Sequence, residues 1–340
     1  MSLSSIQAFD IHGVHVRVET ENSALTAGVA ELLQQFPRVA PVDARALVLT
    51  YRGGARKPDF LARELAPCRG ELLFSSSWDN AYDLARLLGI RLEIYRQDGQ
   101  LLWDYHENGC LRLDKSRGML EGYLAESIDL HPMPLTSFFF LLPLSELLAS
   151  RGLHMIHAAA LEREGRGVLI PGVSGSGKST SCVSLMRAGY RCLSDDKPFL
   201  RSNGNGIELL AFPESIDVTD RTVSFFPELR VAPSQDLKAG YRKKQFRADA
   251  IYPDSTTNAV RPALILFPQI SGESRSRLEK LSKIRALEAI LPHGLLVLDA
   301  ETSGHQFDLL ARLIESAECY RLSFGRDVLE LPSLVDALLE

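Results

Sequence analysis

Two short stretches of the sequence combine residue types that suit phosphate chemistry. The first, here called the glycine-rich loop, is Gly172-Val-Ser-Gly-Ser-Gly-Lys-Ser-Thr180, which fits the pattern G-x-x-x-x-G-K-[ST]. In this pattern the glycines let successive backbone N–H groups point at phosphate oxygens. The lysine adds a cation at the β- and γ-phosphates, and the final hydroxyl ligates Mg²⁺. The residues expected to bind a nucleoside triphosphate are Gly172, Ser174, Gly175, Ser176, Gly177, Lys178, Ser179 and Thr180. The alternative is a flexible Gly/Ser turn that binds no ligand.

The second stretch is the acidic pair Asp195-Asp196, which follows Lys178 by 17 and 18 residues. Transfer of a phosphoryl group needs a carboxylate for the Mg²⁺ ion and a group that orients or deprotonates the attacking hydroxyl. Two adjacent carboxylates can divide these tasks, one facing the metal and the other facing the acceptor. The sequence leaves open which acid has which task, and a solvated Asp-Asp turn is the alternative.

The elements around both stretches are those that such a site requires. Val168-Leu-Ile170 has the composition of a buried strand, and residues 179–188 predict a helix whose N-terminus holds an anion. A strand at 155–161 and the short turn 162–166 come before, which predicts an antiparallel hairpin that leads into the loop. A short strand at 190–193 ends at the acidic pair.

The first 150 residues predict a small α+β domain. Two alternating runs flank His12-Gly13 and predict a hairpin, and Asn22 is placed to cap a helix that ends before Pro37. Further predicted elements are a strand at 46–51, a helix at 79–88, a three-stranded meander at 91–95, 101–105 and 110–114, and an apolar helix at 135–149. This region shows no metal or nucleophile constellation, and we expect His12 and His15 to be surface or half-buried side chains. We place the domain boundary near residue 150, with domains at 1–150 and 151–340.

The second domain continues beyond the acidic pair. Its other predicted elements are strands at 263–267, 277–281 and 319–324, and helices at 284–291, 307–314 and 331–339. The basic stretch Tyr241-Arg-Lys-Lys-Gln-Phe-Arg247 offers Lys244 and Arg247 as contacts to the γ-phosphoryl group in the transition state, with a solvated loop as the alternative. Glu214 is a further acid for the metal or the acceptor.

Composition excludes several classes of protein. The chain has 340 residues, 45% of them hydrophobic and 24% charged, which is typical of a globular protein with a substantial core. The net charge of −5 gives no basic field for nucleic acid or an acidic membrane. Five scattered cysteines predict reduced thiols. The most apolar run, Phe138-Phe-Phe-Leu-Leu-Pro-Leu144, is too short to span a bilayer, and the N-terminus lacks a signal-peptide pattern, so we expect a cytoplasmic protein.

Three runs of residues together resemble the catalytic domain of HPr kinase/phosphorylase and its relatives. They are Ile156-His-Ala-Ala-Ala-Leu161, the glycine-rich loop and Gly189-Tyr-Arg-Cys-Leu-Ser-Asp-Asp196. The family pattern is a histidine that opens the first hairpin strand, a phosphate loop, a helix ending in Gly-His/Tyr-Arg, and a strand ending in Asp-Asp. The resemblance covers roughly half of the chain, and the sequence after Asp196 departs from the family signature. It implies an α/β fold of the phosphoenolpyruvate-carboxykinase-like kind: a P-loop kinase domain of the HPr kinase C-terminal type, with a mixed sheet and a hairpin that leads into the loop.

The resemblance also implies an activity and roles for residues. The activity is ATP-dependent phosphorylation of a serine-type hydroxyl, with ATP and Mg²⁺ bound. Asp196 is then a base or a group that orients the nucleophile, Asp195 and Ser179 lie on the Mg²⁺ side, and His157 lies near the transferring phosphate. Lys178 neutralises developing charge. His154 has no expected role.

These observations predict an ATP-dependent kinase that acts on a Ser/Thr-type hydroxyl of a peptide or small protein. The N-terminal domain would present the acceptor. The alternatives are a kinase for a small molecule, such as free serine or a sugar, and a regulatory protein that senses nucleotide without a base. We expect no nucleic-acid or membrane partner, and the oligomeric state stays open.

Overall fold

The protein is described by a computed structural model in which two compact units are distinct, residues 1–151 and 152–340. The structure describes residues 5–40, 45–54, 70–77, 89–126, 128, 132–238, 241–294 and 300–340. Each unit has its own sheet and its own core, and each is treated separately below.

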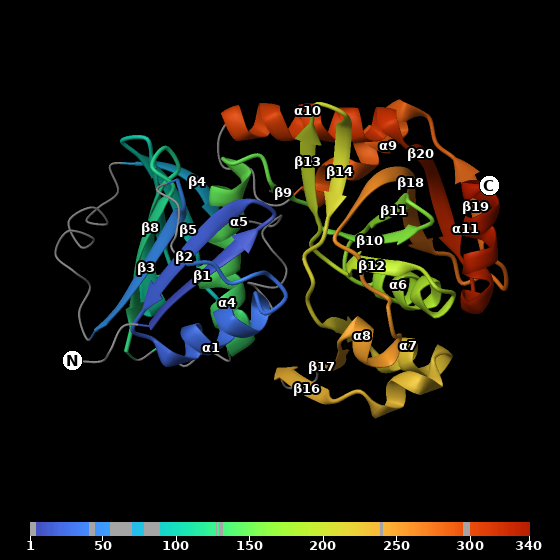
Figure 1. Ribbon diagram of the computed structural model, residues 1–340, viewed down its shortest axis with the longest axis horizontal. Coiled ribbons are helices and arrows are strands. Elements are labelled where there is room, and N and C mark those ends of the chain that lie inside the picture. Colours follow the sequence, from blue (N-terminus) through green and yellow to red (C-terminus); the bar gives the residue numbers. More distant parts are fainter. Residues whose placement is uncertain are drawn as a thin grey trace. The chain divides into compact units, whose positions relative to one another are not determined.

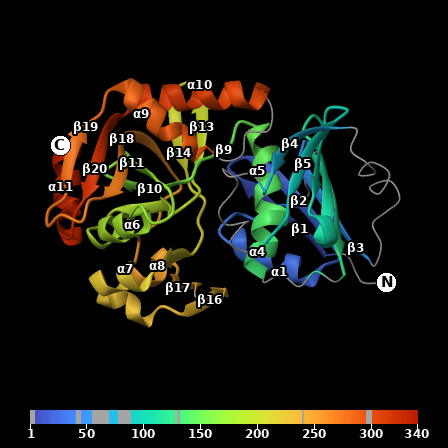
Figure 2. The same cartoon turned by 180° about the vertical axis from the view of Figure 1, so that it is seen from behind.

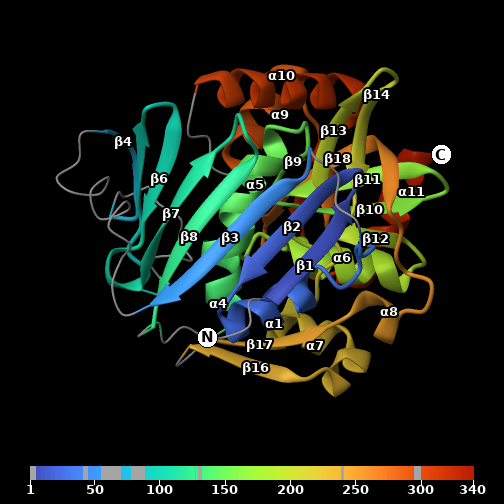
Figure 3. The ribbon, with the colours of Figure 1, turned by 60° about the vertical axis from the view of Figure 1, so that its left-hand side comes forward.

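The N-terminal unit contains an eight-stranded sheet in the order β1-β2-β3-β8-β7-β6-β5-β4 (Figure 3). Its strands are β1 (Ser5–Ile11), β2 (Val14–Thr20), β3 (Leu47–Gly54), β4 (Glu71–Ser75), β5 (Glu93–Gln97), β6 (Gln100–Asp104), β7 (Gly109–Asp114) and β8 (Met119–Ala125). The predicted hairpin is confirmed, because Ile11 pairs with Val14 and both turn residues, His12 and Gly13, have positive φ. The predicted meander is confirmed as β5, β6 and β7. The sequence did not predict β8, or the parallel pairing of β3 with β2 and β8.

Helices pack on this sheet within the unit. They are α1 (Ser23–Leu32), α4 (Pro132–Thr136), a π-helical turn (Ser137–Leu141) and α5 (Leu142–Ala149). Asn22 caps α1 as predicted, since its side chain accepts the N–H of Leu25. The apolar helix is confirmed, and its π-helical turn is a new feature: the hydroxyl of Tyr51 donates to the carbonyl of Phe139. A buried tyrosine of the sheet thus fixes this helical segment by a hydrogen bond as well as by apolar contact.

The second unit contains a nine-stranded mixed sheet, ordered β12-β10-β11-β18-β14-β13-β9, with β20 on β18 and β19 on β20. Its strands are β9 (His154–Met155), β10 (Ala158–Arg163), β11 (Arg166–Pro171), β12 (Arg191–Ser194), β13 (Phe199–Asn203), β14 (Gly206–Leu210), β18 (Ala259–Ile270), β19 (Arg277–Lys280) and β20 (Glu318–Phe324). The predicted hairpin of β10 and β11 is confirmed as antiparallel. Beyond it, β11, β18 and β20 run parallel. The unit is therefore a mixed α/β structure.

Helices cover both faces of this sheet (Figures 1 and 2). They are α6 (Lys178–Arg187), α9 (Lys283–Ile290), α10 (Ala300–Ser316) and α11 (Leu331–Leu339). Successive strand residues point to opposite faces, so Val168 and Ile170 pack with α6 and α11 while Leu169 packs with α9 and α10. The near-continuous apolar runs of β10, β11 and β18 follow from burial on both sides.

Some elements differ from the sequence-based expectations. Strand β18 and helix α10 are longer than the predicted 263–267 and 307–314. The hairpin β13–β14 was not predicted, nor was a separate three-stranded sheet of β15 (Ile216–Val218), β17 (Tyr241–Phe246) and β16 (Ser234–Lys238) with α7 (Asp220–Phe225) and α8 (Ala248–Ile251) beside it. The basic stretch 241–247 is thus mostly a strand. The predicted helix at 79–88 lies outside the described residues.

Within the described parts of the chain, no helix has the length and apolarity needed to cross a membrane. The four cysteines that the structure describes carry free thiols. Cys68 lies outside the described residues.

Candidate active site

The glycine-rich loop joins the C-terminal end of β11 to the first turn of α6. Its conformation needs glycine at two positions, because Gly175 and Gly177 have φ values of +82° and +108°. At Gly177 a side chain would also clash sterically, since a Cβ atom there would lie 2.9 Å from the ring of Phe324 at the end of β20. The helix begins at Lys178, directly after this glycine. The pattern of glycines therefore has a structural cause in this chain.

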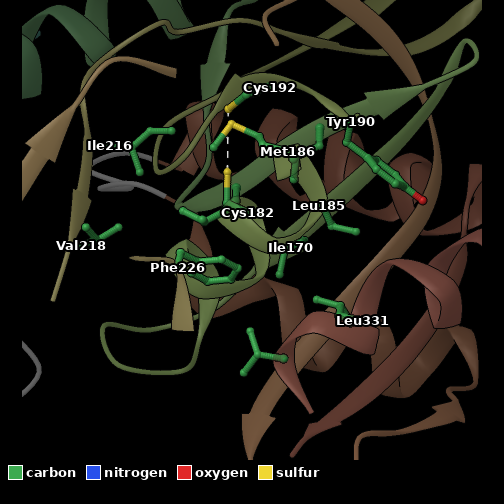
Figure 4. Close-up of a cluster of buried hydrophobic side chains, with 14 of the residues drawn as sticks. Ile170, Cys182, Leu185, Met186, Tyr190, Cys192, Ile216, Val218, Phe226 and Leu331 are labelled. Atoms are coloured by element: carbon green, nitrogen blue, oxygen red, sulfur yellow. Dashed lines mark hydrogen bonds between the residues drawn. The ribbon is translucent and has the colours of Figure 1, made fainter. Parts of the chain in front are cut away.

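An apolar cluster below the loop fixes α6 against the strand that carries the acidic pair (Figure 4). Cys182 of α6 and Cys192 of β12 face each other in it, with their sulfur atoms 3.8 Å apart. Ile170, Met186 and Tyr190 belong to the same cluster. This packing holds the start of α6 and the end of β12 at a set separation.

Lys178 is the centre of the polar contacts at the loop. Its side chain is only 7% exposed. The ammonium group donates to the carbonyl of Gly172 at 3.0 Å and lies 2.6 Å from Nε2 of His157 and 3.3 Å from Oδ1 of Asp196. The structure thus brings together three residues that the sequence singled out separately.

Asp195 faces the other side of the loop. Its Oδ2 atom accepts the hydroxyl of Ser179 at 3.2 Å, while its Oδ1 atom is buried without a hydrogen-bond partner. Burial raises the pKa of Asp195 to about 7, and the charge of Asp196 adds to this rise. A buried carboxylate with an unpaired oxygen is a strong candidate for a cation ligand.

Asp196 has the opposite electrostatic setting. Burial alone would raise its pKa, but the charges of Lys197 and Lys178 and the ring of His157 outweigh this and hold the pKa well below its ordinary value. Its Oδ1 atom lies 3.4 Å from Nδ1 of His157 and its Oδ2 atom 3.0 Å from the ammonium of Lys197. The backbone N–H groups of Asp196 and Lys197 both donate to the hydroxyl of Ser194, which sets the turn after β12.

His157 lies between the lysine and the acid. Burial lowers the pKa of its ring to about 4, with Asp196 opposing this and Lys178 adding to it. The ring is therefore neutral at pH 7. Because Nε2 faces an ammonium group and Nδ1 faces a carboxylate, we assign the proton to Nδ1.

Lys197, Glu214 and His293 also belong to this polar cluster. The sequence-based prediction gave no role to Lys197 or His293, and named Glu214 only as a further acid. Lys197 pairs with Glu214 as well as with Asp196. The carbonyl of His293 accepts the backbone N–H of His157, and burial and the charge of Lys178 lower the pKa of its own ring to about 4. Lys197 follows the acidic pair directly, which was an available signal; His293 lies far along the chain and gave none.

The other predicted residues have different surroundings. Ser174 is exposed on the loop, and Thr180 shares a hydrogen bond with Thr222 at 2.9 Å. Lys244 donates to the carbonyls of Arg230 and Ala232. Arg247 pairs with Asp249. The role of Lys244 and Arg247 in the transition state stays a prediction.

The donor set suits Mg²⁺. Mg²⁺ takes oxygen ligands and usually binds through one or two protein groups together with water and substrate phosphates. The hydroxyl of Ser179 and the carboxylate of Asp195 are such groups, and the unpaired Oδ1 of Asp195 leaves a ligand position open. Among the described residues no cluster of three or more His, Cys, Asp or Glu side chains is arranged to hold a metal ion.

Comparison with known proteins gives a limited match. No protein-family model matches the chain. A segment of 61 residues, 18% of this chain, is 36% identical to HPr kinase/phosphorylase of Exiguobacterium sibiricum. That segment is 20% of the relative, so the chain matches about a fifth of the relative's length. The sequence match supports an HPr-kinase-like relationship for this segment.

A solved structure carries a related name. The HPr(Ser) kinase/phosphatase of Coxiella burnetii is 16% identical, with coverage of 54% of this chain and 93% of that chain and a TM-score of 0.29. A TM-score this low carries no argument about the fold.

Proposed function

We propose that the protein is an ATP- and Mg²⁺-dependent phosphotransferase with an alcohol acceptor, a Ser/Thr-type hydroxyl of a peptide or small protein. One observation carries the proposal: two adjacent acids divide between two sides of the glycine-rich loop. Asp195 lies 3.2 Å from the hydroxyl of Ser179, and Asp196 lies 3.3 Å from the ammonium of Lys178. Phosphoryl transfer needs this division, because one carboxylate serves the metal and another serves the attacking hydroxyl.

Each residue then has a part in the transfer. The loop amides and Lys178 would bind the β- and γ-phosphates, and Ser179 and Asp195 would hold Mg²⁺, which supplies positive charge to the phosphate oxygens when bound. Asp196 accepts a hydrogen bond from the incoming hydroxyl and orients its oxygen towards the γ-phosphorus. The new O–P bond forms as the bond between the γ-phosphorus and the β-phosphate oxygen breaks and ADP leaves, and the hydroxyl proton moves to Asp196 only as the new bond forms. The low pKa of Asp196 favours orientation over proton storage, since a weak base gains little from taking the proton early. Nδ1 of His157 lies 3.4 Å from Oδ1 of Asp196, on the side of the carboxylate that faces Lys178.

The acceptor class rests on the names of relatives and on the motifs. The matched relative is named as a kinase of HPr, and the resemblance of the motifs points to a serine-type hydroxyl. The N-terminal unit has a sheet and core of its own, and we assign it to acceptor presentation.

The test is transfer of label from [γ-³²P]ATP into a cell extract that has been separated into macromolecules, peptides and small metabolites. We expect the wild-type protein to label the peptide or protein fraction. Asp196→Asn is expected to lose about 10³-fold or more of the transfer rate while it binds Mg·ATP within about threefold of wild type, since the orienting group acts mainly in the transition state. Asp308→Asn, an exposed acid on α10, is the matched control and should behave as wild type.

The result also separates the candidate activities. Label only in small metabolites would move the assignment to a small-molecule kinase. Unchanged transfer by Asp196→Asn would refute the role given to this acid, and nucleotide binding without transfer to any fraction would refute the kinase proposal.

A further inference from the structure

An ion-pair chain continues from Asp196 away from the glycine-rich loop. The ammonium of Lys197 lies 3.0 Å from Oδ2 of Asp196, and Glu214 accepts from the same ammonium at 3.0 and 3.2 Å. The side chains of Lys197 and Glu214 are mostly buried, with exposures of 24% and 15%. The contacts are short and largely shielded from water, unlike an exposed ion pair such as Lys280–Glu318.

The two oxygens of Asp196 are held from opposite sides. Oδ1 faces Lys178 and His157, whereas Oδ2 faces only Lys197 among these groups. A carboxylate turns about its Cβ–Cγ bond, so fixing one oxygen also sets the direction of the other. Holding Oδ2 keeps Oδ1 pointed at the place where Lys178 would meet the phosphate.

Glu214 explains why this lysine stays on Asp196. A lysine side chain has many rotamers, and an ammonium near a triphosphate would be drawn to the phosphate charge. Two hydrogen bonds to one buried carboxylate oppose that movement. Glu214 is itself a mostly buried acid, and burying an acid is unfavourable unless it pairs with a cation, so its presence indicates that Lys197 is held in place.

We propose that Lys197 and Glu214 form a positioning pair that orients Asp196 for the incoming hydroxyl, without themselves contacting the nucleotide. This inference rests on the proposed phosphoryl transfer and deepens it. Lys178 and Lys197 thereby have different tasks: the first acts on phosphate, and the second acts through the acid.

The first test separates catalysis from binding. Lys197→Met is expected to lower the rate of label transfer to the acceptor fraction by about 100-fold, the scale of a small misplacement of a reacting group. The affinity for fluorescent mant-ATP with Mg²⁺ should stay within about threefold of wild type, and Lys197→Arg should recover most of the rate. Lys280→Met, at an exposed pair with Glu318, is the matched control and should change neither quantity. A loss of mant-ATP affinity as large as the loss of rate would overturn the proposal, because Lys197 would then bind the nucleotide.

A double-mutant cycle tests whether Lys197 acts through Asp196. In the Asp196→Asn background, Lys197→Met should have no further effect on rate; an undiminished 100-fold effect would contradict the inference. Since removal of one partner leaves a buried charge, the double variant Lys197→Met/Glu214→Gln is made as well. Its thermal unfolding, compared with that of wild type, shows whether the unit is folded.

A third measurement needs no activity. If Asp196 turns when Lys197 is removed, the 3.4 Å contact between Nδ1 of His157 and Oδ1 of Asp196 changes, and the ¹⁵N signals of this ring should shift in Lys197→Met but not in Lys280→Met. His157→Gln identifies the signals. Unshifted signals would overturn the positioning pair even if the wild type is an active kinase. If the wild type transfers no label, the proposed function fails, and the ring signals still decide whether Lys197 orients the acid.

Discussion

The burial of Asp195 predicts that replacing it with asparagine stabilises the second unit while removing the proposed Mg²⁺ ligand. We consider Asp195→Asn, which keeps the size of the side chain and removes its charge. The carboxylate is 6% exposed, has one oxygen without a partner, and has a pKa raised from 3.8 to about 7 by burial and by Asp196. In the metal-free protein the ionised form of Asp195 is therefore destabilised relative to the protonated form.

The sign and size follow from proton linkage. A carboxyl whose pKa is raised by folding holds its proton more tightly when folded, so its contribution to stability is full below about pH 4 and is lost as the pH rises through 7. The pKa rises by about three, and each pKa unit corresponds to about 1.36 kcal/mol, so the ionised carboxylate lowers the free energy of unfolding by about 4 kcal/mol above pH 7. The amide avoids this cost but brings a buried N–H group that lacks a partner, at about 1–3 kcal/mol. We expect Asp195→Asn to be more stable than wild type by about 1–3 kcal/mol at pH 8, and this gain to grow by about 2 kcal/mol between pH 5.5 and 7.

The assay is urea unfolding of both proteins in EDTA, at several pH values, followed by far-UV circular dichroism. Tryptophan fluorescence is unsuitable because Trp78 and Trp103 both precede the second unit. Comparing the two proteins at each pH cancels the titration of the groups that do not interact with Asp195. A variant that is less stable than wild type at pH 8, or a difference that does not change with pH, would refute the reasoning about this buried charge.

Three other predictions follow from the loop and its helix. Gly177→Ala should destabilise the second unit by about 2–5 kcal/mol, because it combines a positive φ with a clash against the ring at the end of β20, whereas Gly175→Ala should cost only about 1–2 kcal/mol; equal losses in thermal unfolding would contradict the clash. Lys178→Met should weaken Mg·ATP binding at least about tenfold by calorimetry, and unchanged affinity would remove Lys178 from the phosphate site. Tyr190→Phe should lower stability by about 1–2 kcal/mol, because its hydroxyl donates to the carboxylate of Asp336 at 2.6 Å, and a neutral result in urea unfolding would show that this bond adds nothing.

Local patterns predicted the parts of the fold that depend on nearby residues. The hairpin around His12-Gly13 was predictable because a two-residue turn with positive φ joins two alternating runs. The cap at Asn22 was predictable because its side chain bonds an N–H three residues ahead. The glycine-rich loop was predictable as strand, turn and helix because its glycines lie at fixed spacing.

Features that depend on distant pairing were not predictable in this way. The parallel pairing of β3 with β8 joins residues about 70 positions apart, and the sequence of neither strand indicates which strand it pairs with. The sheet of β15, β17 and β16 was not predicted, because the alternation in the basic stretch is short and one of its two partner strands, β15, is separated from it by helix α7.

The same limit applies to the candidate site. Sequence placed Lys178, Asp195 and Asp196 near one another because they flank one helix and one strand. It gave no partner for Lys197, since Glu214 lies in an irregular segment 17 residues on and reaches the site only through the fold.

The central claim is that the two acids serve different sides of the glycine-rich loop. It is tested most directly by the affinity for mant-ATP, measured with and without Mg²⁺, in Asp195→Asn and Asp196→Asn. The account predicts that Asp195→Asn loses the gain in affinity that Mg²⁺ gives the wild-type protein, while Asp196→Asn keeps that gain. Loss of the Mg²⁺ effect in Asp196→Asn, or its survival in Asp195→Asn, would contradict the assignment.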